Sequence, residues 1–247
     1  MRAMTDPPSL GTCGRLDFHA PLSAGRADRL TAALAAAGPS TVLDLGCGWG
    51  RLLLRILEAV PGARGVGVDV HGPDLARGRA DAEARGLSDR VTFVEGPAEK
   101  HLTAADLVLN VGASQAFGDI PAALHALRPL VAPGGRLLFA DGFWQRTPTD
   151  DELAGMWPGA SAGDHTDLAG LVDQATAAGF RPLRIETATR GEWELFESGY
   201  TADVEEWLLA NPAHPRAEAA RAEVDRHRSR WLRGYRDVLG FAFLILG

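Results

Sequence analysis

Three glycines at alternate positions, Gly46, Gly48 and Gly50, directly follow the apolar segment TVLDL at residues 41–45. The segment is typical of a short buried strand, and the apolar spacing over residues 51–60 predicts an amphipathic helix. Glycine adopts backbone angles that a Cβ would forbid, and it lets a ligand approach bare main chain beside the unpaired N–H groups that begin a helix. A strand, a glycine turn and a helix predict half of a nucleotide site.

An acidic residue, Asp69, ends a second predicted strand over residues 64–68, about 19 residues beyond the glycine turn, a separation typical of ribose-binding acids. A carboxylate at this strand end accepts hydrogen bonds from both hydroxyls of a ribose. A plain strand–turn–helix with a surface aspartate is the structural alternative. The placement of the acid after the glycines favours ribose binding.

The spacing of the glycines indicates which nucleotide ligand fits. Dinucleotide-binding turns follow GxGxxG, in which the third glycine lets a pyrophosphate approach the helix. Here the third glycine, Gly50, comes one place earlier. The spacing favours a ligand without a pyrophosphate. Because Asp69 suits the ribose of NAD equally well, an NAD-dependent oxidoreductase stays open as an alternative.

The same residues carry a family resemblance. The string VLDLGCGWG at residues 42–50 resembles motif I of the class I S-adenosylmethionine-dependent methyltransferases, and GVD at residues 67–69 resembles their acidic second motif. The string LVAPGGRLLFAD at residues 130–141 is similar to the turn that precedes the fifth strand of that family. The resemblance implies S-adenosyl-L-methionine as cofactor, with its methionine part over the glycine turn and its ribose on Asp69.

The resemblance also implies which other residues line the cofactor site. After the third predicted strand, residues 91–95, Pro97 replaces an acid common in the family, so the adenine would depend on Glu99 and the backbone of Ala98. A surface carboxylate that caps a helix is an equal alternative for Glu99. After the fourth predicted strand, residues 106–110, the family's chain passes beneath the sulfonium. The implied cofactor-binding residues are Asp44, Gly46, Cys47, Gly48, Asp69, Val70, Ala98, Glu99, Asn110, Gly112 and Gln115.

Candidate catalytic groups lie outside these motifs. Methyl transfer from a sulfonium requires mainly that a nucleophile be aligned with the sulfur, so a dedicated base is optional. If an oxygen or carbon acid needs one, His19 is the first candidate and Glu197 the second. An isolated histidine in a lead-in loop is more often a capping or surface residue. The aromatic residues around Glu197 follow helical spacing, which is typical of a packed helix.

The order of predicted elements indicates the fold class. Six predicted strands separated by helices favour a doubly wound sheet, and residues 241–246 fit the antiparallel last strand of the family. The predicted fold is α/β: a Rossmann-like, doubly wound, seven-stranded sheet, mostly parallel with a C-terminal antiparallel strand, plus a helical cap inserted before the last strand. The expected domains are an N-terminal flap and helix (1–40), a cofactor-binding Rossmann-like core (41–189 and 240–247) and the helical cap (190–239).

Several local features follow from turn residues and charge. The pattern predicts a helix over residues 120–130, then a Pro-Gly-Gly break before a strand over residues 136–141. Asp164 or Thr166 is expected to cap a helix that ends at Ala178. The mixed charges on a predicted helix from about Arg216 to Arg236 are typical of a solvated face.

Composition restricts the partners. The net charge of -7 argues against non-specific nucleic-acid binding, which relies on neutralising phosphates. Two cysteines, Cys13 and Cys47, make a disulfide framework or a zinc site implausible, so we expect no bound metal. No signal-peptide pattern or membrane span is apparent, which predicts a cytoplasmic protein that does not bind membranes. The abundance of Arg, Ala and Gly beside a single lysine indicates a GC-rich bacterial genome.

These observations predict S-adenosylmethionine-dependent methyl transfer to a small-molecule acceptor, through an O, N or C nucleophile, by in-line displacement. The sequence contains no Asn-Pro-Pro-aromatic string of the kind that amino-group nucleic-acid methyltransferases use. The alternatives are the NAD-dependent oxidoreductase and a non-catalytic protein that binds S-adenosylmethionine. The sequence does not indicate the acceptor or the oligomeric state.

Overall fold

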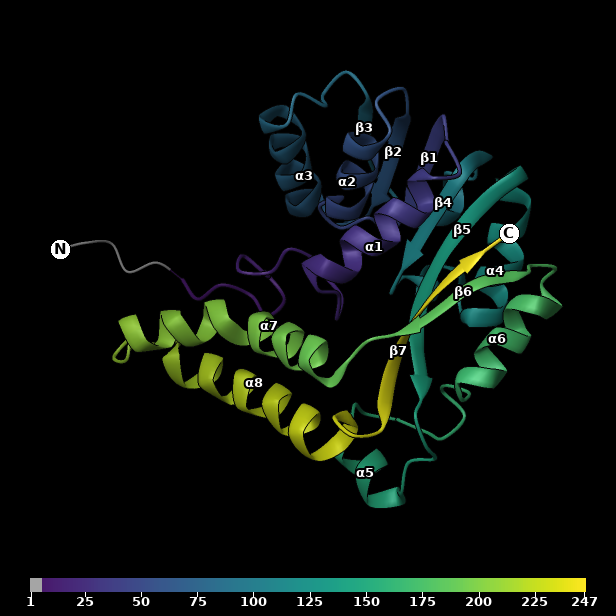
Figure 1. Cartoon of the computed structure of the whole chain (residues 1–247). Coiled ribbons are helices and arrows are strands. Elements are labelled where there is room, and N and C mark those ends of the chain that lie inside the picture. Colours follow the sequence, from purple (N-terminus) through teal and green to yellow (C-terminus); the bar gives the residue numbers. More distant parts are fainter. Residues whose placement is uncertain (1–5) are drawn as a thin grey trace. The chain divides into compact units, whose positions relative to one another are not determined.

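A computed structural model describes residues 6–247 (Figure 1). Across these residues seven strands form one sheet in the order β3-β2-β1-β4-β5-β7-β6. Strands β1 to β5 pair in parallel where they are neighbours, and β6 pairs antiparallel with β7. The predicted fold class, a mostly parallel doubly wound sheet with an antiparallel C-terminal strand, is confirmed. The strands are β1 (Thr41–Leu45), β2 (Arg64–Asp69), β3 (Val91–Glu95), β4 (Ala105–Val111), β5 (Val131–Trp144), β6 (Pro182–Thr187) and β7 (Leu239–Leu246).

Helices connect the strands in the alternation that a doubly wound sheet requires. The α-helices are α1 (Ala24–Ala35), α2 (Arg51–Ala59), α3 (Gly72–Ala84), α4 (Ile120–Leu127), α5 (Asp150–Gly155), α6 (Leu168–Ala177), α7 (Arg190–Ala210) and α8 (Ala217–Arg230). Short 3-10 turns occur at η1 (Ala98–Lys100), η2 (Ser114–Phe117) and η3 (Arg128–Leu130), and a π-helical turn, η4 (Trp231–Tyr235), extends α8.

The chain divides into two compact units. The first, here called the sheet unit, contains Ser23–Phe143, Asp167–Thr187 and Phe241–Gly247. The second, here called the helical unit, contains the described residues up to Leu22 together with Trp144–Thr166 and Ala188–Gly240. Compactness does not identify which residues bind which ligand, so the functional division into flap, core and cap stays a prediction.

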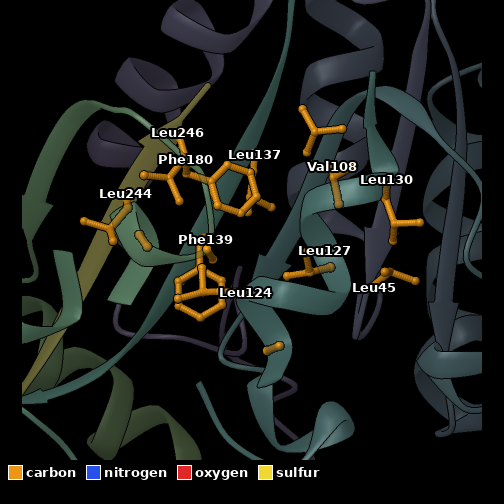
Figure 2. Close-up of a cluster of buried hydrophobic side chains, with 14 of the residues drawn as sticks. Leu45, Val108, Leu124, Leu127, Leu130, Leu137, Phe139, Phe180, Leu244 and Leu246 are labelled. Carbon is orange, nitrogen blue, oxygen red and sulfur yellow. The ribbon is translucent and has the colours of Figure 1, made fainter. Parts of the chain in front are cut away.

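One core cluster of the sheet unit lies between the sheet and helices α4 and α6 (Figure 2). Leu137 and Phe139 of β5 and Leu244 of β7 are fully buried there against Leu124 of α4. Burial of each such side chain contributes about 1.5–3 kcal/mol. Alternate side chains of a strand point to opposite faces, so Phe243, next to Leu244, lies on the other face, where the Arg26 guanidinium of α1 covers its ring.

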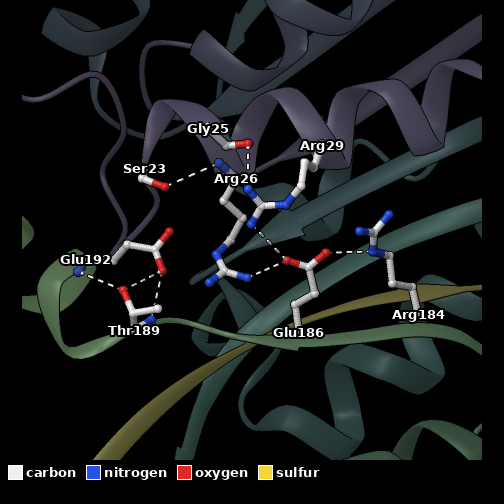
Figure 3. A network of polar contacts seen from close by, with 8 residues as sticks. All are labelled: Ser23, Gly25, Arg26, Arg29, Arg184, Glu186, Thr189 and Glu192. Atoms are coloured by element: carbon white, nitrogen blue, oxygen red, sulfur yellow. Dashed lines mark hydrogen bonds and ion pairs between the residues drawn. The ribbon is translucent and has the colours of Figure 1, made fainter.

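An ion cluster fastens α1 to the edge strand β6 within the sheet unit (Figure 3). Arg26 is only 5% exposed, and its guanidinium donates to the Glu186 carboxylate. Glu186 also lies 2.6 Å from Arg184 Nε and 3.5 Å from Arg29. Helix α1 begins at its cap Ser23, whose hydroxyl accepts from the Arg26 amide at 3.2 Å. One carboxylate therefore neutralises a buried guanidinium and is itself surrounded by positive charge.

The predicted end of the helix before β5 and the predicted start of β5 both differ from the structure. Helix α4 ends at Leu127 and continues as the 3-10 turn η3, because Pro129 has no N–H for the α-helical ladder. The Pro-Gly-Gly segment lies inside β5 and does not precede it. Ala105 pairs with Val131, and the register shifts before Leu107 pairs with Arg136, so these residues form an irregularity within the strand.

The predicted cap of α6 is also wrong. Asp167 caps the helix, because its carboxylate accepts from the Gly170 amide at 2.8 Å. Asp164 instead accepts from the amide and hydroxyl of Ser161 and from Trp157 Nε1, at 2.9–3.2 Å. Both acids suit a cap by sequence, and the loop contacts of Asp164 decide between them.

We expect Glu186→Ala to lower the free energy of unfolding by about 3–5 kcal/mol, because it removes the carboxylate that accepts from the buried Arg26 guanidinium. Asp28→Ala is the matched control: it removes an exposed ion pair to Arg55 from the same helix and should cost about 0–1 kcal/mol. Denaturant unfolding of both variants measures the difference. Equal, small losses would show that the cluster does not stabilise the fold.

Candidate active site

The glycine turn adopts the backbone that its sequence predicts. Gly46, Gly48 and Gly50 have φ of 78°, 53° and 65°, in the left-handed region that side chains disfavour. A Cβ on Gly46 would lie 2.3 Å from the Ala113 Cβ, and one on Gly50 would lie 2.5 Å from the Phe93 ring. Among residues 6–247, nothing lies within 4 Å of a Cβ placed on Gly48. The outer two glycines therefore allow close packing, and Gly48 faces open space.

Asp69 fastens the end of β2 to this turn. Its Oδ2 accepts from the Gly48 amide at 2.7 Å, and its Oδ1 accepts from the His71 amide at 2.9 Å. The amides of Gly46 and Cys47 donate to the Val68 carbonyl at 2.9 and 3.0 Å, which closes the turn onto β2. Each carboxylate oxygen has a second lone pair, so Asp69 keeps capacity for further donors.

Two side chains at this turn, Asp44 and Cys47, have raised pKa values, and the charge of Asp69 contributes to both. Asp44 is 5% exposed, and burial, reinforced by the negative charge of Asp69, raises its pKa to about 8. Burial also raises the pKa of the Cys47 thiol, with the charges of Asp44 and Asp69 adding to the effect. The thiol donates to the Gly48 carbonyl at 3.4 Å. Cys47 is therefore a neutral thiol and not a nucleophile.

Asn110, at the carboxyl end of β4, carries an unsatisfied acceptor. Its side chain is fully buried, and Nδ2 donates to the Leu45 carbonyl at 3.0 Å. Its Oδ1 has no hydrogen-bond partner among residues 6–247. A buried acceptor without a donor costs free energy that a bound ligand's N–H or O–H would recover. The Asn110 side chain therefore lies beside the start of the glycine turn, because Leu45, whose carbonyl it contacts, immediately precedes Gly46.

The remaining predicted cofactor residues lie on neighbouring strand ends. Gly112 has φ of 65° and accepts from Gln115 Nε2 at 3.2 Å. Val70 follows Asp69 and is 70% exposed. Ala98 is buried and Glu99 exposed in the turn η1, which contacts η2. The structure thus brings the predicted cofactor residues to the carboxyl edge of β1 to β4; their roles stay predictions.

The two predicted catalytic residues, His19 and Glu197, lie in the helical unit. His19 lies near the Tyr200 ring, and Glu197 contacts His227, which stacks on the same ring. Glu197 is 3% exposed; its Oε2 lies 2.8 Å from His227 Nε2, and its Oε1 accepts from the Tyr235 hydroxyl at 2.8 Å. The ring of Tyr200 stacks on His227 with centroids 4.7 Å apart. The exposed His19 ring lies 6.1 Å from the same tyrosine. No motif or spacing in the sequence indicated His227, which lies in the charge-rich helix predicted to be solvated.

The N-terminal segment, predicted as a flap, lies along α7 in the described residues. The Gly11 amide donates to the Tyr200 carbonyl at 3.2 Å, and the Gly14 amide donates to the Asp203 carboxylate at 2.8 Å. Leu16 packs so tightly on Gly199 that a Cβ there would lie 2.3 Å from Leu16 Cδ2. These contacts hold the segment beside the predicted catalytic residues of the same unit.

In residues 6–247, no group of three or more His, Cys, Asp or Glu side chains has an arrangement that could hold a metal ion. Across the same part of the chain, none of the helices combines the length and the apolar character needed to cross a bilayer.

The raised pKa of Asp44 predicts a pH-dependent stability. Between about pH 4, where an unfolded aspartate titrates, and about pH 8, the folded protein holds a proton that the unfolded chain lacks. The contribution of Asp44 to the free energy of unfolding therefore falls as the pH rises through this window. We expect Asp44→Asn to lack this slope, so that its stability relative to wild type increases from about pH 5 to about pH 8.

Denaturant unfolding at several pH values measures this difference, and Asp89→Asn serves as the control because Asp89 is exposed on a loop of the same unit. Parallel curves for wild type and Asp44→Asn would show that Asp44 ionises without a cost in the folded protein.

Comparison with known proteins places this geometry in a family. A family model described as a methyltransferase domain matches residues 43–137. The uncharacterized protein YjhP of Escherichia coli (strain K12) is 28% identical over 207 residues, which is 83% of each chain. The crystal structure of a SAM-dependent methyltransferase from Geobacter sulfurreducens, in complex with S-adenosyl-L-homocysteine, has a TM-score of 0.84 at 27% identity and covers 93% of both chains.

A second solved methyltransferase agrees. The SAM-dependent methyltransferase from Thiobacillus denitrificans, also in complex with S-adenosyl-L-homocysteine, has a TM-score of 0.86 at 26% identity over 98% of this chain and 99% of its own. The family match spans the glycine turn, Asp69 and Asn110, which are the residues that the structure gathers at one sheet edge. The match identifies residues 43–137 as a methyltransferase domain, and the chain is similar over most of its length to S-adenosylmethionine-dependent methyltransferases.

Proposed function

We propose that the protein transfers the methyl group of S-adenosyl-L-methionine to a small-molecule acceptor by in-line displacement. The observation that carries this proposal is the left-handed Gly48, which faces open space while its amide is held by the ribose-binding candidate Asp69. The match of residues 43–137 to a methyltransferase domain disfavours the alternative of an NAD-dependent oxidoreductase, as does the absence of a glycine one place after Gly50.

The residues present fit the cofactor in three ways. Asp69 keeps lone pairs for the ribose hydroxyls, and the buried Asn110 Oδ1 lacks a donor that a polar ligand group would supply. Asp44 is placed to lose its proton in favour of a nearby positive charge, which the cofactor supplies through its sulfonium and ammonium groups. The full proposed set is Asp44, Gly46, Cys47, Gly48, Asp69, Val70, Ala98, Glu99, Asn110, Gly112 and Gln115.

The acceptor is proposed to be small because the chain carries a net charge of -7, which opposes binding to phosphate polymers. We propose that the helical unit recognises it, with His19 and Glu197 as the candidate groups for proton transfer. Glu197 already uses both oxygens within the unit, which favours a role through its neighbours over direct contact with the acceptor.

Transfer of radiolabelled methyl from S-adenosyl-L-methionine into bacterial extract tests the substrate class. We expect label in acid-soluble small molecules. Label only in acid-precipitated protein or nucleic acid would overturn the small-molecule acceptor. Tight S-adenosyl-L-homocysteine binding with no transfer in any fraction would favour the non-catalytic alternative.

The glycine turn predicts a selective loss of cofactor binding in Gly48→Ala. Gly38→Ala is the matched control, because Gly38 has φ of 62° and no described residue lies within 4 Å of a Cβ added to it. Both variants should lose about 1 kcal/mol of stability to the strained backbone. By calorimetry, only Gly48→Ala should bind S-adenosyl-L-homocysteine at least about ten-fold more weakly. Equal affinities would show that the turn is not the cofactor site.

The ribose assignment predicts that Asp69→Ala weakens S-adenosyl-L-homocysteine binding by about 1.5–3 kcal/mol, the range for hydrogen bonds to a charged acceptor. Asp89→Ala, on an exposed loop of the sheet unit, should leave the affinity unchanged. Calorimetry of the folded variants checks both values. An unchanged affinity in Asp69→Ala would remove the ribose from this carboxylate.

A further inference from the structure

The helical unit contains a buried carboxylate–imidazole pair that no cofactor motif explains. Glu197 is buried in α7, and its two oxygens engage two residues that follow it by 30 and 38 positions, His227 at 2.8 Å and Tyr235 at 2.8 Å. The histidine side chain is 21% exposed, whereas the carboxylate is 3% exposed. A charged group is thus placed behind a titratable ring that reaches solvent.

The hydrogen bonds fix which nitrogen of His227 carries the proton. Burial, together with the charge of Glu197, raises the pKa of Tyr235, so its hydroxyl keeps its proton and donates to Glu197. An ionised carboxylate only accepts, so the neutral imidazole must donate through Nε2. The lone pair is then on Nδ1, which has no hydrogen-bond partner in residues 6–247. Tyr200, stacked on the ring, restricts its rotation.

His227 lines a hollow of about 430 Å³, within the size range of small-molecule pockets. Two arginines of α8, Arg226 and Arg230, line the same hollow, one helical turn apart on one face. Neither forms an ion pair or hydrogen bond with any other described residue. Glu223 and Tyr200 complete its ionisable lining. Two unpaired guanidiniums beside an imidazole favour an anion, and their planar geometry suits a carboxylate.

We propose that this hollow binds a small carboxylate that bears a hydroxyl group, with Arg226 and Arg230 on the carboxylate and His227 Nδ1 accepting a hydrogen bond from the hydroxyl. All of these side chains belong to the helical unit, so the binding does not depend on the methyl transfer proposed above. Glu197 is a positioning residue, because its contact with Nε2 leaves the lone pair of the ring on Nδ1.

The first part of the test reads the imidazole directly. In full-length protein labelled with 15N-histidine, NMR at neutral pH should show His227 as the Nε2–H tautomer. Glu197→Gln should shift the ring toward a mixture of tautomers. Tyr235→Phe, which removes one hydrogen bond and keeps the carboxylate, should retain the Nε2–H tautomer and controls for misfolding. A wild-type Nδ1–H tautomer would overturn the proton assignment.

The second part tests the ligand class with 4-hydroxybenzoate as probe and 4-hydroxybenzamide, which lacks the carboxylate, as control. We expect the benzoate to shift the His227 ring signals to saturation and the benzamide to have no effect. Replacement of both hollow arginines, Arg226→Gln with Arg230→Gln, should weaken the apparent affinity at least about ten-fold. Arg221→Gln, an exposed arginine of the same helix outside the hollow, should leave it unchanged.

Absence of any His227 response to 4-hydroxybenzoate, or equal weakening by Arg221→Gln, would overturn the carboxylate site. These outcomes are distinguishable from failure of the proposed function. The NMR readouts need no cofactor and no turnover, whereas the calorimetry of S-adenosyl-L-homocysteine binding needs no ligand in this hollow.

Discussion

The hydrogen bond between the Gly48 amide and the Asp69 carboxylate is the contact on which the candidate cofactor site depends. It joins the loop after β1 to the end of β2, so two segments that are separate in sequence hold one geometry. The bond is possible because Gly48 takes a left-handed backbone that points its N–H at the acid. The same conformation leaves open space beside Gly48, and the site combines a fixed anion with bare main chain.

Three buried or partly buried carboxyl groups of this protein have different electrostatic surroundings. Glu186 and Arg26 neutralise each other between α1 and β6, and Glu197 accepts hydrogen bonds from two side chains. Burial raises the pKa of Asp44, and the negative charge of Asp69 raises it further. A buried carboxylate that is paired inside the fold stabilises the structure. A buried acid beside a like charge instead favours the binding of a cationic ligand, because the ligand's charge offsets the repulsion.

The helical unit adds chemistry that the methyltransferase motifs do not contain. Its glycines allow close approach: Gly11 lies under the Tyr200 ring, and Gly199 accommodates Leu16. These contacts hold the N-terminal segment on α7, where it contributes Ser9 to the hollow that His227 lines. The match to a methyltransferase domain spans residues 43–137 and therefore includes neither the N-terminal segment nor α7 and α8.

The sequence by itself determined the fold class, the bounds of β1 and β3, the glycine turn and the acid that follows it, and the structure and the family comparison confirm these. Such features depend on local rules, since apolar periodicity and the angles open to glycine act over a few residues. Tertiary structure alone decided that Asp167 caps α6 and that Glu197 holds His227. Those outcomes depend on which side chains meet across elements, and no spacing along one helix specifies a partner 30 residues away.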